Sequence, residues 1–212
     1  MSASVQSSEE SKWLGYYQWT SQRSSDPWAT AVKAVDLFQS EGVAPELAVD
    51  LGSGIGKDTA FFINNGWRVI AVDAEEVSRE FLFDKIPASK RDDVTFVAST
   101  YENFVFPHNV QLINASYALP FCSPANFDDL MKRITSAISV GGRFCGHFFG
   151  PKDTWSKDES MVFTDEKQIK SYFKDFKIEY FNEEEHDGIS GSGVKHWHLF
   201  EVVAQKVQKS HL

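Results

Sequence analysis

The chain has 212 residues, of which 42% are hydrophobic and 14% aromatic, a composition that excludes an intrinsically disordered protein and favours a single globular domain. Its 30 acidic and 21 basic residues give a net charge of −9, which argues against binding to nucleic acid or to an anionic membrane surface. The only two cysteines, Cys122 and Cys145, are too few for a disulfide framework, and no apolar stretch is long enough for a transmembrane helix. We therefore expect a cytoplasmic protein.

Residues 1–27 are predicted to form an N-terminal arm ahead of the folded domain. The first eleven residues are rich in Ser and Glu and lack the basic and apolar regions of a secretory signal. From Trp13 to Trp28, the first residue after the arm, the chain is aromatic and polar, with Tyr16, Tyr17 and Trp19 between them. Asp26 and Pro27 indicate the N-cap and the first residue of a helix, whose apolar residues recur at helical spacing up to Ser40.

Beyond the arm, short apolar strands alternate with helices. The predicted strands are Leu47–Leu51, Trp67–Val72, Val94–Ala98, Val110–Asn114, Arg143–Phe149, Lys177–Phe181 and Val194–Val203. The predicted helices are residues 28–40, 57–65, 75–85, 124–139 and 165–173, the last with Thr164 as N-cap. This alternation is typical of βαβ units and predicts an α/β, Rossmann-like three-layer sandwich around a mostly parallel seven-stranded sheet.

The end of the chain departs from this alternation. No helix separates the last two strands, and their connection, Asn182–Gly193, is polar and Gly-rich, so we expect a hairpin and an antiparallel last strand. The domain is predicted to span residues 28–206, followed by a tail at residues 207–212.

The segment Val49–Gly56, with the sequence VDLGSGIG, ends the first strand and opens the next helix. Its three glycines let the loop turn sharply and bring its backbone close to a ligand, and the helix behind it offers free N–H groups. Seventeen residues after Gly56, the second strand ends at Asp73, where a carboxylate can accept hydrogen bonds from both hydroxyls of a ribose. Together these features predict a site for a cofactor that contains a nucleoside.

Asp50 helps to choose between cofactors. The spacing G-x-G-x-G differs from the G-x-G-x-x-G of dinucleotide-binding proteins, and the Asp50 carboxylate would repel a pyrophosphate. The same carboxylate suits the ammonium group of S-adenosylmethionine. We therefore favour a methyltransferase, with a nucleotide-dependent oxidoreductase and a non-catalytic cofactor-binding module as the alternatives.

The sequence resembles the class I S-adenosylmethionine-dependent methyltransferases over about residues 13–206, in particular the small bacterial branch related to tellurite-resistance methyltransferases. The segments that carry the resemblance are Ala48–Gly56, Val69–Asp73, Leu112–Phe121 and Gly141–Phe144. It implies seven strands with the last antiparallel. It also implies that Gly52, Ser53, Gly54 and Gly56 surround the methionine part of the cofactor, Asp73 and Ala74 the ribose, Tyr101 and Glu102 the adenine, and Asn114 and Ala115 the methyl-transfer site.

The arm and two histidine-containing strands supply further candidates. In related enzymes such an arm folds over the cofactor as a lid, in which aromatic faces such as that of Tyr17 would hold the sulfonium and Arg23 would bind the methionine carboxylate; plain packing on the core is the alternative. Tyr16 is a candidate substrate-binding residue. His147 lies on the fifth strand, near its carboxyl end, and is a candidate general base or substrate-orienting residue, or else a structural histidine. Tyr117, next to the methyl-transfer segment, is a candidate substrate-binding residue.

His196 and His198 lie on one face of the last strand and are further candidate substrate-binding residues, although a cross-strand packing pair is the favoured interpretation. No cysteine or carboxylate accompanies them at zinc spacing, so we predict no metal. Segment 153–160, with Trp155, could contribute to a substrate cover, and Phe121, Phe148 and Phe149 could line an apolar pocket.

These features predict methyl transfer from S-adenosylmethionine to an O, N or S atom of a small-molecule acceptor by in-line displacement. The size of the chain favours a planar or apolar acceptor over a protein. Detoxification of tellurite or selenite is the alternative reaction. We expect a monomer or a homodimer, without nucleic-acid or membrane partners.

Overall fold

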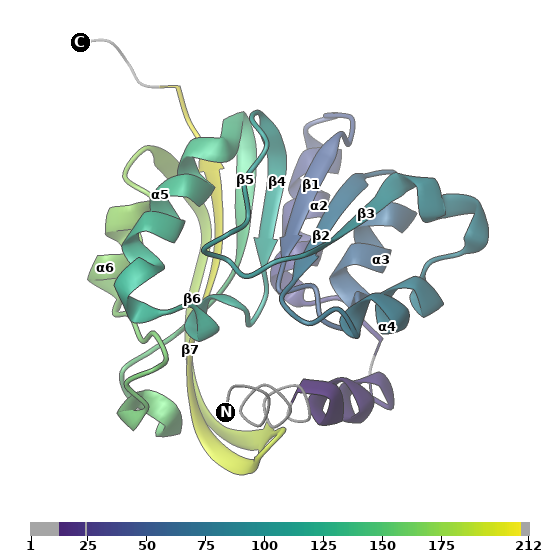
Figure 1. Cartoon of the computed structure of the whole chain (residues 1–212). Helices are drawn as coiled ribbons and strands as arrows, with labels where there is room; N and C mark the ends of the chain where they lie inside the picture. The colour runs from purple at the N-terminus through teal and green to yellow at the C-terminus, as the bar shows by residue number, and fades with distance from the viewer. Residues whose placement is uncertain (1–12, 24, 209–212) are drawn as a thin grey trace.

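The computed structural model describes residues 13–23 and 25–208 (Figure 1). Parts of the predicted arm and tail, residues 1–12, 24 and 209–212, lie outside the described residues. One sheet has the strand order β3-β2-β1-β4-β5-β7-β6. Its strands are β1 (Leu47–Leu51), β2 (Arg68–Asp73), β3 (Val94–Ala98), β4 (Val110–Ala115), β5 (Ile138–Phe149), β6 (Phe176–Ser190) and β7 (Gly193–Lys206). β1 to β5 are parallel to one another and β7 is antiparallel to both of its neighbours, so the predicted fold is confirmed.

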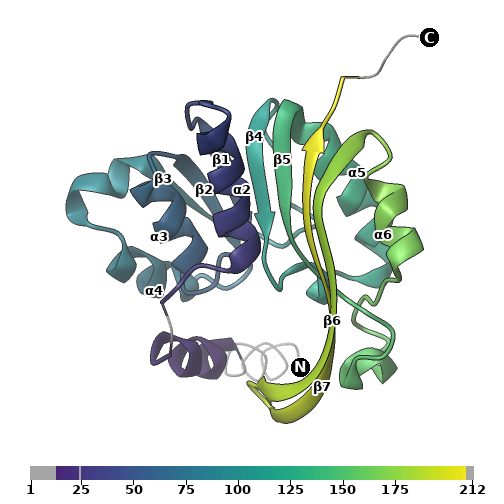
Figure 2. The ribbon, with the colours of Figure 1, turned by 180° about the vertical axis from the view of Figure 1, so that it is seen from behind.

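Helices cover both faces of this sheet (Figures 1 and 2). They are α2 (Ala29–Ser40), α3 (Lys57–Asn64), α4 (Ser78–Lys85), α5 (Phe127–Ala137) and α6 (Glu166–Tyr172). Successive residues of a strand point to opposite faces, so Ala48 packs with the core under α2, α3 and α4, whereas Val49 packs with the core under α5 and α6. The strands are therefore apolar throughout, as two covered faces require.

The carboxyl ends of the parallel strands meet at one edge of the sheet, the lower edge in Figure 1. The helical segment at residues 13–21 and the far end of the β6–β7 hairpin both lie beyond this edge. They approach each other closely, because a Cβ atom at Gly191 would lie 3.0 Å from the ring of Tyr16. These two segments enclose the space below the strand ends.

The two predicted helix caps differ from the observed ones. α2 begins at Ala29 with Trp28 as N-cap, rather than at Pro27, because the Trp28 backbone is extended and its N–H donates to the Asp58 carboxylate at 2.9 Å. α6 has Asp165 as N-cap, with a 2.7 Å hydrogen bond from the Gln168 N–H, whereas the Thr164 N–H donates to a β5 carbonyl. Both predicted caps lie within one turn of the observed ones.

The last three strands are longer than predicted. Segment 124–139 does not continue as a helix to the paired glycines, because Ile138 already pairs with Val110 and begins β5. The segment Asn182–Gly193, predicted as a connecting loop, is almost entirely strand, and β6 and β7 stay paired from Phe176 to Ser190. The hairpin thus extends well beyond the rest of the sheet (Figure 2).

Candidate functional site

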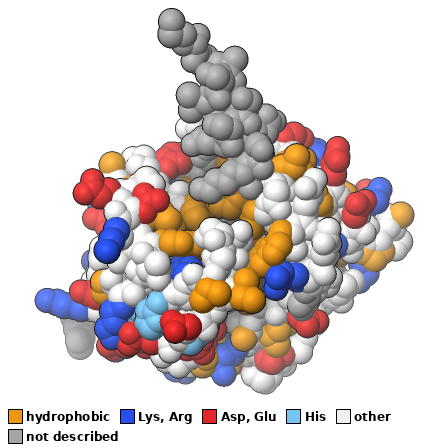
Figure 3. All heavy atoms as spheres, turned by 90° about the horizontal axis from the view of Figure 1, so that it is seen from below, with side chains coloured by type: hydrophobic (Ala, Val, Ile, Leu, Met, Phe, Trp, Pro, Cys, Tyr) orange, Lys and Arg blue, Asp and Glu red, His pale blue; other side chains and the backbone are white. Residues whose placement is uncertain are grey.

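A cavity of about 1150 Å³ lies at the carboxyl edge of the sheet. One part, which we call the glycine-loop half, lies beyond β1, β2 and β3 and is lined by Asp50, Gly52, Ser53, Gly54, Asp73, Ala74, Glu75, Thr100, Tyr101 and Glu102. The other part, the aromatic half, lies beyond β4, β5 and β7 and is lined by Trp28, Tyr117, Phe121, Phe149, Trp155 and Trp197. Figure 3 looks onto this edge and shows hydrophobic side chains gathered in the middle of the face.

The glycine loop has little space for side chains at its glycine positions. Gly52 has a φ of 65°, and a Cβ atom there would lie 2.6 Å from the Ala118 Cβ and 2.8 Å from the Tyr101 hydroxyl. Gly54 also has a positive φ, of 51°, and the Tyr17 ring packs beside it. The loop therefore presents bare backbone to the cavity, which is what a closely bound ligand requires.

Asp73 ends β2 and is buried, yet three groups donate hydrogen bonds to it. Its Oδ2 accepts from the Gly54 N–H at 2.8 Å, and its Oδ1 accepts from the Glu75 N–H and from the Tyr17 hydroxyl, both at 2.9 Å. Burial raises the pKa of the Asp73 carboxyl, and these hydrogen bonds oppose the rise. Tyr17 thus ties the N-terminal helix to the carboxylate at the centre of the glycine-loop half.

A second buried carboxylate, Asp50, belongs to a polar cluster behind the glycine loop. It accepts hydrogen bonds from the Thr59 hydroxyl at 2.5 Å and from the Asn114 amide at 2.8 Å. The same amide nitrogen donates to Asp58 at 3.0 Å, so Asn114 holds the two carboxylates together. Burial and the neighbouring Asp58 raise the pKa of Asp50. A cation placed in the cavity would lower the electrostatic cost of this cluster.

Tyr117 stands where the two halves of the cavity meet, directly after β4. Its φ of 55° is a left-handed backbone conformation that bulky residues rarely adopt. Its ring lies 4.2 Å from the His147 ring in a stacked arrangement and 4.3 Å from the Trp28 ring, as measured between centroids. Burial raises the pKa of the Tyr117 phenol, which therefore stays protonated at neutral pH. Strain of this kind is tolerated where the surroundings hold a side chain in one position.

Two cations line the cavity, and both lie over aromatic rings. The Lys57 ammonium is 3.3 Å from the centroid of the Trp28 ring, and burial lowers the pKa of Lys57. The Arg23 guanidinium lies 3.9 Å from the centroid of the Trp19 ring. Six carboxylates also line the cavity, at Asp50, Asp58, Asp73, Glu75, Glu102 and Asp158. The described wall of the cavity is therefore acidic.

Most of the residues predicted to bind cofactor or substrate line this one cavity. They are Tyr16, Tyr17, Arg23, Asp50, Gly52, Ser53, Gly54, Asp73, Ala74, Tyr101, Glu102 and Tyr117. Four others lie behind the wall, at Gly56, Asn114, Ala115 and His147. Gly56 is needed for packing, because a Cβ atom there would lie 2.7 Å from Leu82.

His147 is fully buried behind Tyr117 and Trp28. Its Nε2 is 3.6 Å from the nearest Glu201 carboxylate oxygen, beyond hydrogen-bond distance. With Tyr117 in this position, the imidazole does not reach the cavity and cannot take a proton from a molecule bound there.

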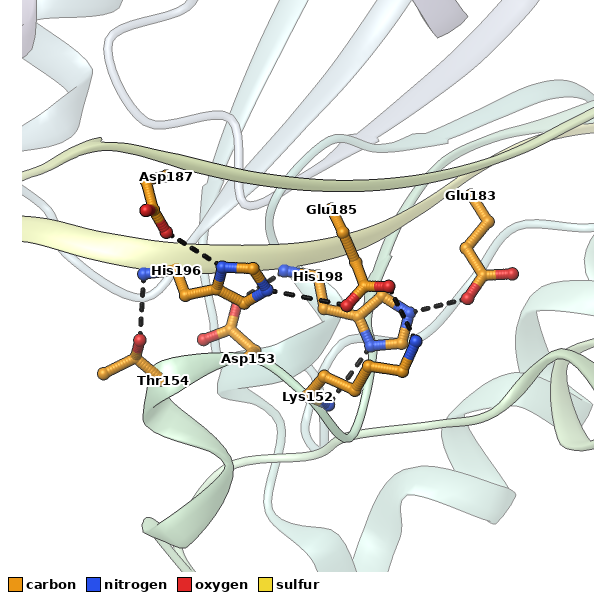
Figure 4. Close-up of polar contacts among 8 residues, drawn as sticks. All are labelled: Lys152, Asp153, Thr154, Glu183, Glu185, Asp187, His196 and His198. Atoms are coloured by element: carbon orange, nitrogen blue, oxygen red, sulfur yellow. Dashed lines mark hydrogen bonds and ion pairs between the residues drawn. The ribbon is translucent and has the colours of Figure 1, made fainter.

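His196 and His198 also lie away from the cavity, where they join β6 and β7 to the segment after β5 (Figure 4). The His198 Nδ1 accepts from the Lys152 N–H at 3.1 Å, and its Nε2 contacts the Glu183 carboxylate at 2.9 Å. His196 contacts Asp187 on the paired strand at 2.9 Å. These contacts agree with the cross-strand interpretation. Among the described residues, no group of three or more His, Cys, Asp or Glu side chains is arranged to hold a metal ion.

Several residues that line the cavity were not predicted from the sequence. Lys57 and Asp58 directly follow the glycine loop, and their position after Gly56 could have marked them. The hairpin residues His186 and Gly188–Ser192 had no such signal, because their segment reads as a polar loop. None of the helices in the described part of the chain is long and apolar enough to cross a membrane.

Residues 48–142 match the family described as "Methyltransferase domain". The matched segment carries the glycine loop, Asp73, Tyr101 and Tyr117, which are the residues of the cavity's centre. The chain resembles the class I S-adenosylmethionine-dependent methyltransferases. The resemblance to methyltransferases predicted from the sequence is thereby confirmed. A comparison with curated proteins gave no match.

Solved structures of methyltransferases share this fold at low sequence identity. TehB from Haemophilus influenzae is 18% identical with a TM-score of 0.68; the match covers 82% of this chain but only 62% of the TehB chain. The 1,6-didemethyltoxoflavin-N1-methyltransferase of Burkholderia thailandensis, solved with 1,6-didemethyltoxoflavin and S-adenosylhomocysteine, is 19% identical with a TM-score of 0.65, covering 98% of this chain and 91% of that one. Magnesium protoporphyrin IX methyltransferase from Synechocystis, solved with S-adenosylmethionine, is 15% identical with a TM-score of 0.61, covering 91% and 80%.

Proposed function

We propose that this protein transfers the methyl group of S-adenosylmethionine to an O, N or S atom of a small-molecule acceptor. The observation that carries the proposal is the single cavity of about 1150 Å³. It joins a glycine cradle and a ribose-binding carboxylate to a chamber walled by aromatic rings, so that a donor and an acceptor would lie side by side. The matched methyltransferase domain supports this assignment.

The residues of the glycine-loop half fit S-adenosylmethionine. The bare backbone of Gly52 and Gly54 leaves room for the methionine part, and a Cβ atom at Gly52 would clash with Ala118 and Tyr101 in the wall of the cavity. Asp73 has acceptor capacity for ribose hydroxyls, and Tyr101 and Glu102 follow β3, where the adenine would lie. The buried carboxylate of Asp50 favours a cofactor that carries a positive charge.

When bound, S-adenosylmethionine supplies an electrophilic methyl group on a sulfonium centre. The chain's own contribution is to hold the acceptor in line and to exclude water. The helix at residues 13–21 would act as the lid of the predicted arm, because Tyr17 packs beside the glycine loop and bonds to Asp73. His147 acts as a positioning residue, since its ring supports Tyr117 from behind.

Calorimetry separates this proposal from the oxidoreductase alternative. We expect the protein to bind S-adenosylhomocysteine and not NADH, and Asp73→Ala to lose measurable S-adenosylhomocysteine binding. Unchanged affinity in Asp73→Ala would remove the cofactor assignment. Transfer of tritium from methyl-labelled S-adenosylmethionine into a small-molecule extract then separates an enzyme from a non-catalytic module.

Methylation of tellurite or selenite is the second candidate, favoured by the structural similarity to TehB. These oxyanions are hydrated and call for cationic or N–H donors, whereas the aromatic half offers mainly ring faces. We therefore expect a label-transfer assay with sodium tellurite or selenite as the acceptor to show no product.

A further inference from the structure

The tryptophans of this chain are concentrated at the cavity. Five of the six line it, namely Trp13, Trp19, Trp28, Trp155 and Trp197, and only Trp67 lies in the core. They come from the arm, from the segment after β5 and from β7. Aromatic side chains are normally used to fill the interior, so five of them around one hollow indicate a surface made for a ligand.

The wall formed by Trp155 and Trp197 is fixed from behind by a buried ion pair. The Lys195 ammonium lies 3.5 Å from the centroid of the Trp155 ring and 3.8 Å from that of the Trp197 ring, and 2.5 Å from the Asp153 carboxylate. Asp153 also accepts a hydrogen bond from the Trp155 N–H at 2.9 Å. Both Lys195 and Asp153 are buried. The two indoles are thus held in place before any ligand arrives, which reduces the entropy lost on binding.

The Tyr117 ring, which borders this wall, is fixed as well. Tyr117 is held in its left-handed backbone conformation between His147 and Trp28, and its ring lies 6.1 Å from that of Trp197 in an edge-to-face arrangement. Tyr117 also directly follows β4, on the side of the glycine-loop half. A molecule in contact with both rings would therefore lie near the donor side of the cavity.

The charge of the wall narrows the class of ligand further. Most of the six lining carboxylates belong to the glycine-loop half, and both lining cations already lie over indole rings, so the described lining of the aromatic half offers little to hold an anionic molecule. The Lys195 ammonium behind Trp155 and Trp197 disfavours a positive charge on the cavity side of the same rings.

We propose that the acceptor is a flat, uncharged aromatic ring system that packs against Trp155, Trp197 and Tyr117, by stacking or edge-to-face contact, and presents its methyl-accepting atom toward the end of β4. This inference rests on the proposed function, because the molecule is an acceptor only if the glycine-loop half holds the methyl donor. Ring faces recognise other ring faces through offset stacking and edge-to-face contacts, which a saturated ring of the same shape lacks.

A matched pair of probes tests the class of acceptor. Calorimetry on protein saturated with S-adenosylhomocysteine compares 2-naphthol with decahydro-2-naphthol, which has the same carbon skeleton and hydroxyl group without aromatic faces. We expect 2-naphthol to bind about tenfold more tightly or better. Equal affinity for the two probes, no binding of 2-naphthol, or tighter binding of choline or selenite would overturn the proposal.

Variants of the two tryptophans test where 2-naphthol binds. Trp197→Leu and, independently, Trp155→Leu should each weaken 2-naphthol binding about tenfold or more while leaving S-adenosylhomocysteine affinity within about twofold. Tyr180→Leu is the matched control, since Tyr180 lies on β6 and does not line the cavity. An unchanged affinity for 2-naphthol in both tryptophan variants would contradict the inference. Failure of the wild type to bind S-adenosylhomocysteine would instead contradict the proposed function, whatever 2-naphthol does.

Discussion

Replacing Tyr17 by Phe removes one hydrogen bond and keeps the ring that packs beside Gly54. The Asp73 carboxylate has about four acceptor sites. Tyr17 and Glu75 occupy both sites of Oδ1, and Gly54 occupies one site of Oδ2. A ribose that offers two hydroxyl groups needs two sites, so one of the present donors must leave, and only Tyr17 belongs to a segment that can move without unfolding the loop.

The expected change in S-adenosylhomocysteine affinity follows from the type of hydrogen bond that Tyr17→Phe removes. A hydrogen bond to a charged group contributes about 1.5–3 kcal/mol, so removing this competitor should tighten S-adenosylhomocysteine binding by roughly 10-fold, and by about 150-fold at most. Tyr16→Phe is the control, because the Tyr16 hydroxyl makes no hydrogen bond to the described part of the chain, and it should leave the affinity unchanged. Calorimetry measures the S-adenosylhomocysteine affinity of both variants.

The effects of substitutions at Tyr17 and Asp73 on S-adenosylhomocysteine affinity should depend on each other. In an Asp73→Asn background, where the carboxylate is gone, Tyr17→Phe should lose its effect on S-adenosylhomocysteine affinity. Weaker binding by Tyr17→Phe in the wild-type background would refute the competition and show instead that the Tyr17 hydroxyl contacts the ligand.

Gly52→Ala should abolish S-adenosylhomocysteine binding through its clash with Ala118, whereas Gly42→Ala, with a nearly equal φ of 68° but no atom within 4 Å, should only destabilise the fold by about 1 kcal/mol. Because burial raises the pKa of Asp50, the folded state holds that proton more tightly than the unfolded chain. This stabilisation is complete below about pH 4 and is lost as the pH rises through the raised pKa, so urea unfolding should show a stability decrease from pH 5 to pH 8 that Asp50→Asn reduces. His147→Phe should keep the acceptor KM and the pH profile, whereas His147→Ala should raise that KM; loss of kcat in His147→Phe would show that the imidazole transfers a proton.

The glycine-loop half could be predicted from the sequence because its signals are local. The glycines, Asp50 and Asp73 occur within 24 residues, and each lies at the end of a strand whose apolar run is plain. The order of the strands then places the loop and Asp73 at one edge without any knowledge of side-chain packing. Asn114 was placed at the right edge for the same reason, although its amide turns to the carboxylates behind the loop and not to the cavity.

The aromatic half could not be predicted in the same way. Trp28, Tyr117, Trp155 and Trp197 belong to four segments that meet only after the sheet has formed. Trp28 was predicted to lie in the first turn of a helix, but the bond from its N–H to Asp58 keeps it extended ahead of the helix and leaves its ring beside Tyr117. No spacing in the sequence indicates such a bond, because it joins residues 30 positions apart.

The hairpin shows why polar residues that look like ligands can shape a site without touching it. A Cβ atom at Gly150 would lie 2.1 Å from the His198 Nδ1, so the segment after β5 can pass His198 only as glycine. Since this Nδ1 accepts the Lys152 N–H, the ring proton of the neutral histidine lies on Nε2 and is donated to Glu183. The polar face of the hairpin is thereby tied to the segment that carries Asp153 and Trp155. Substitutions there should alter the aromatic chamber, and with it the choice of acceptor, while the glycine-loop half stays intact.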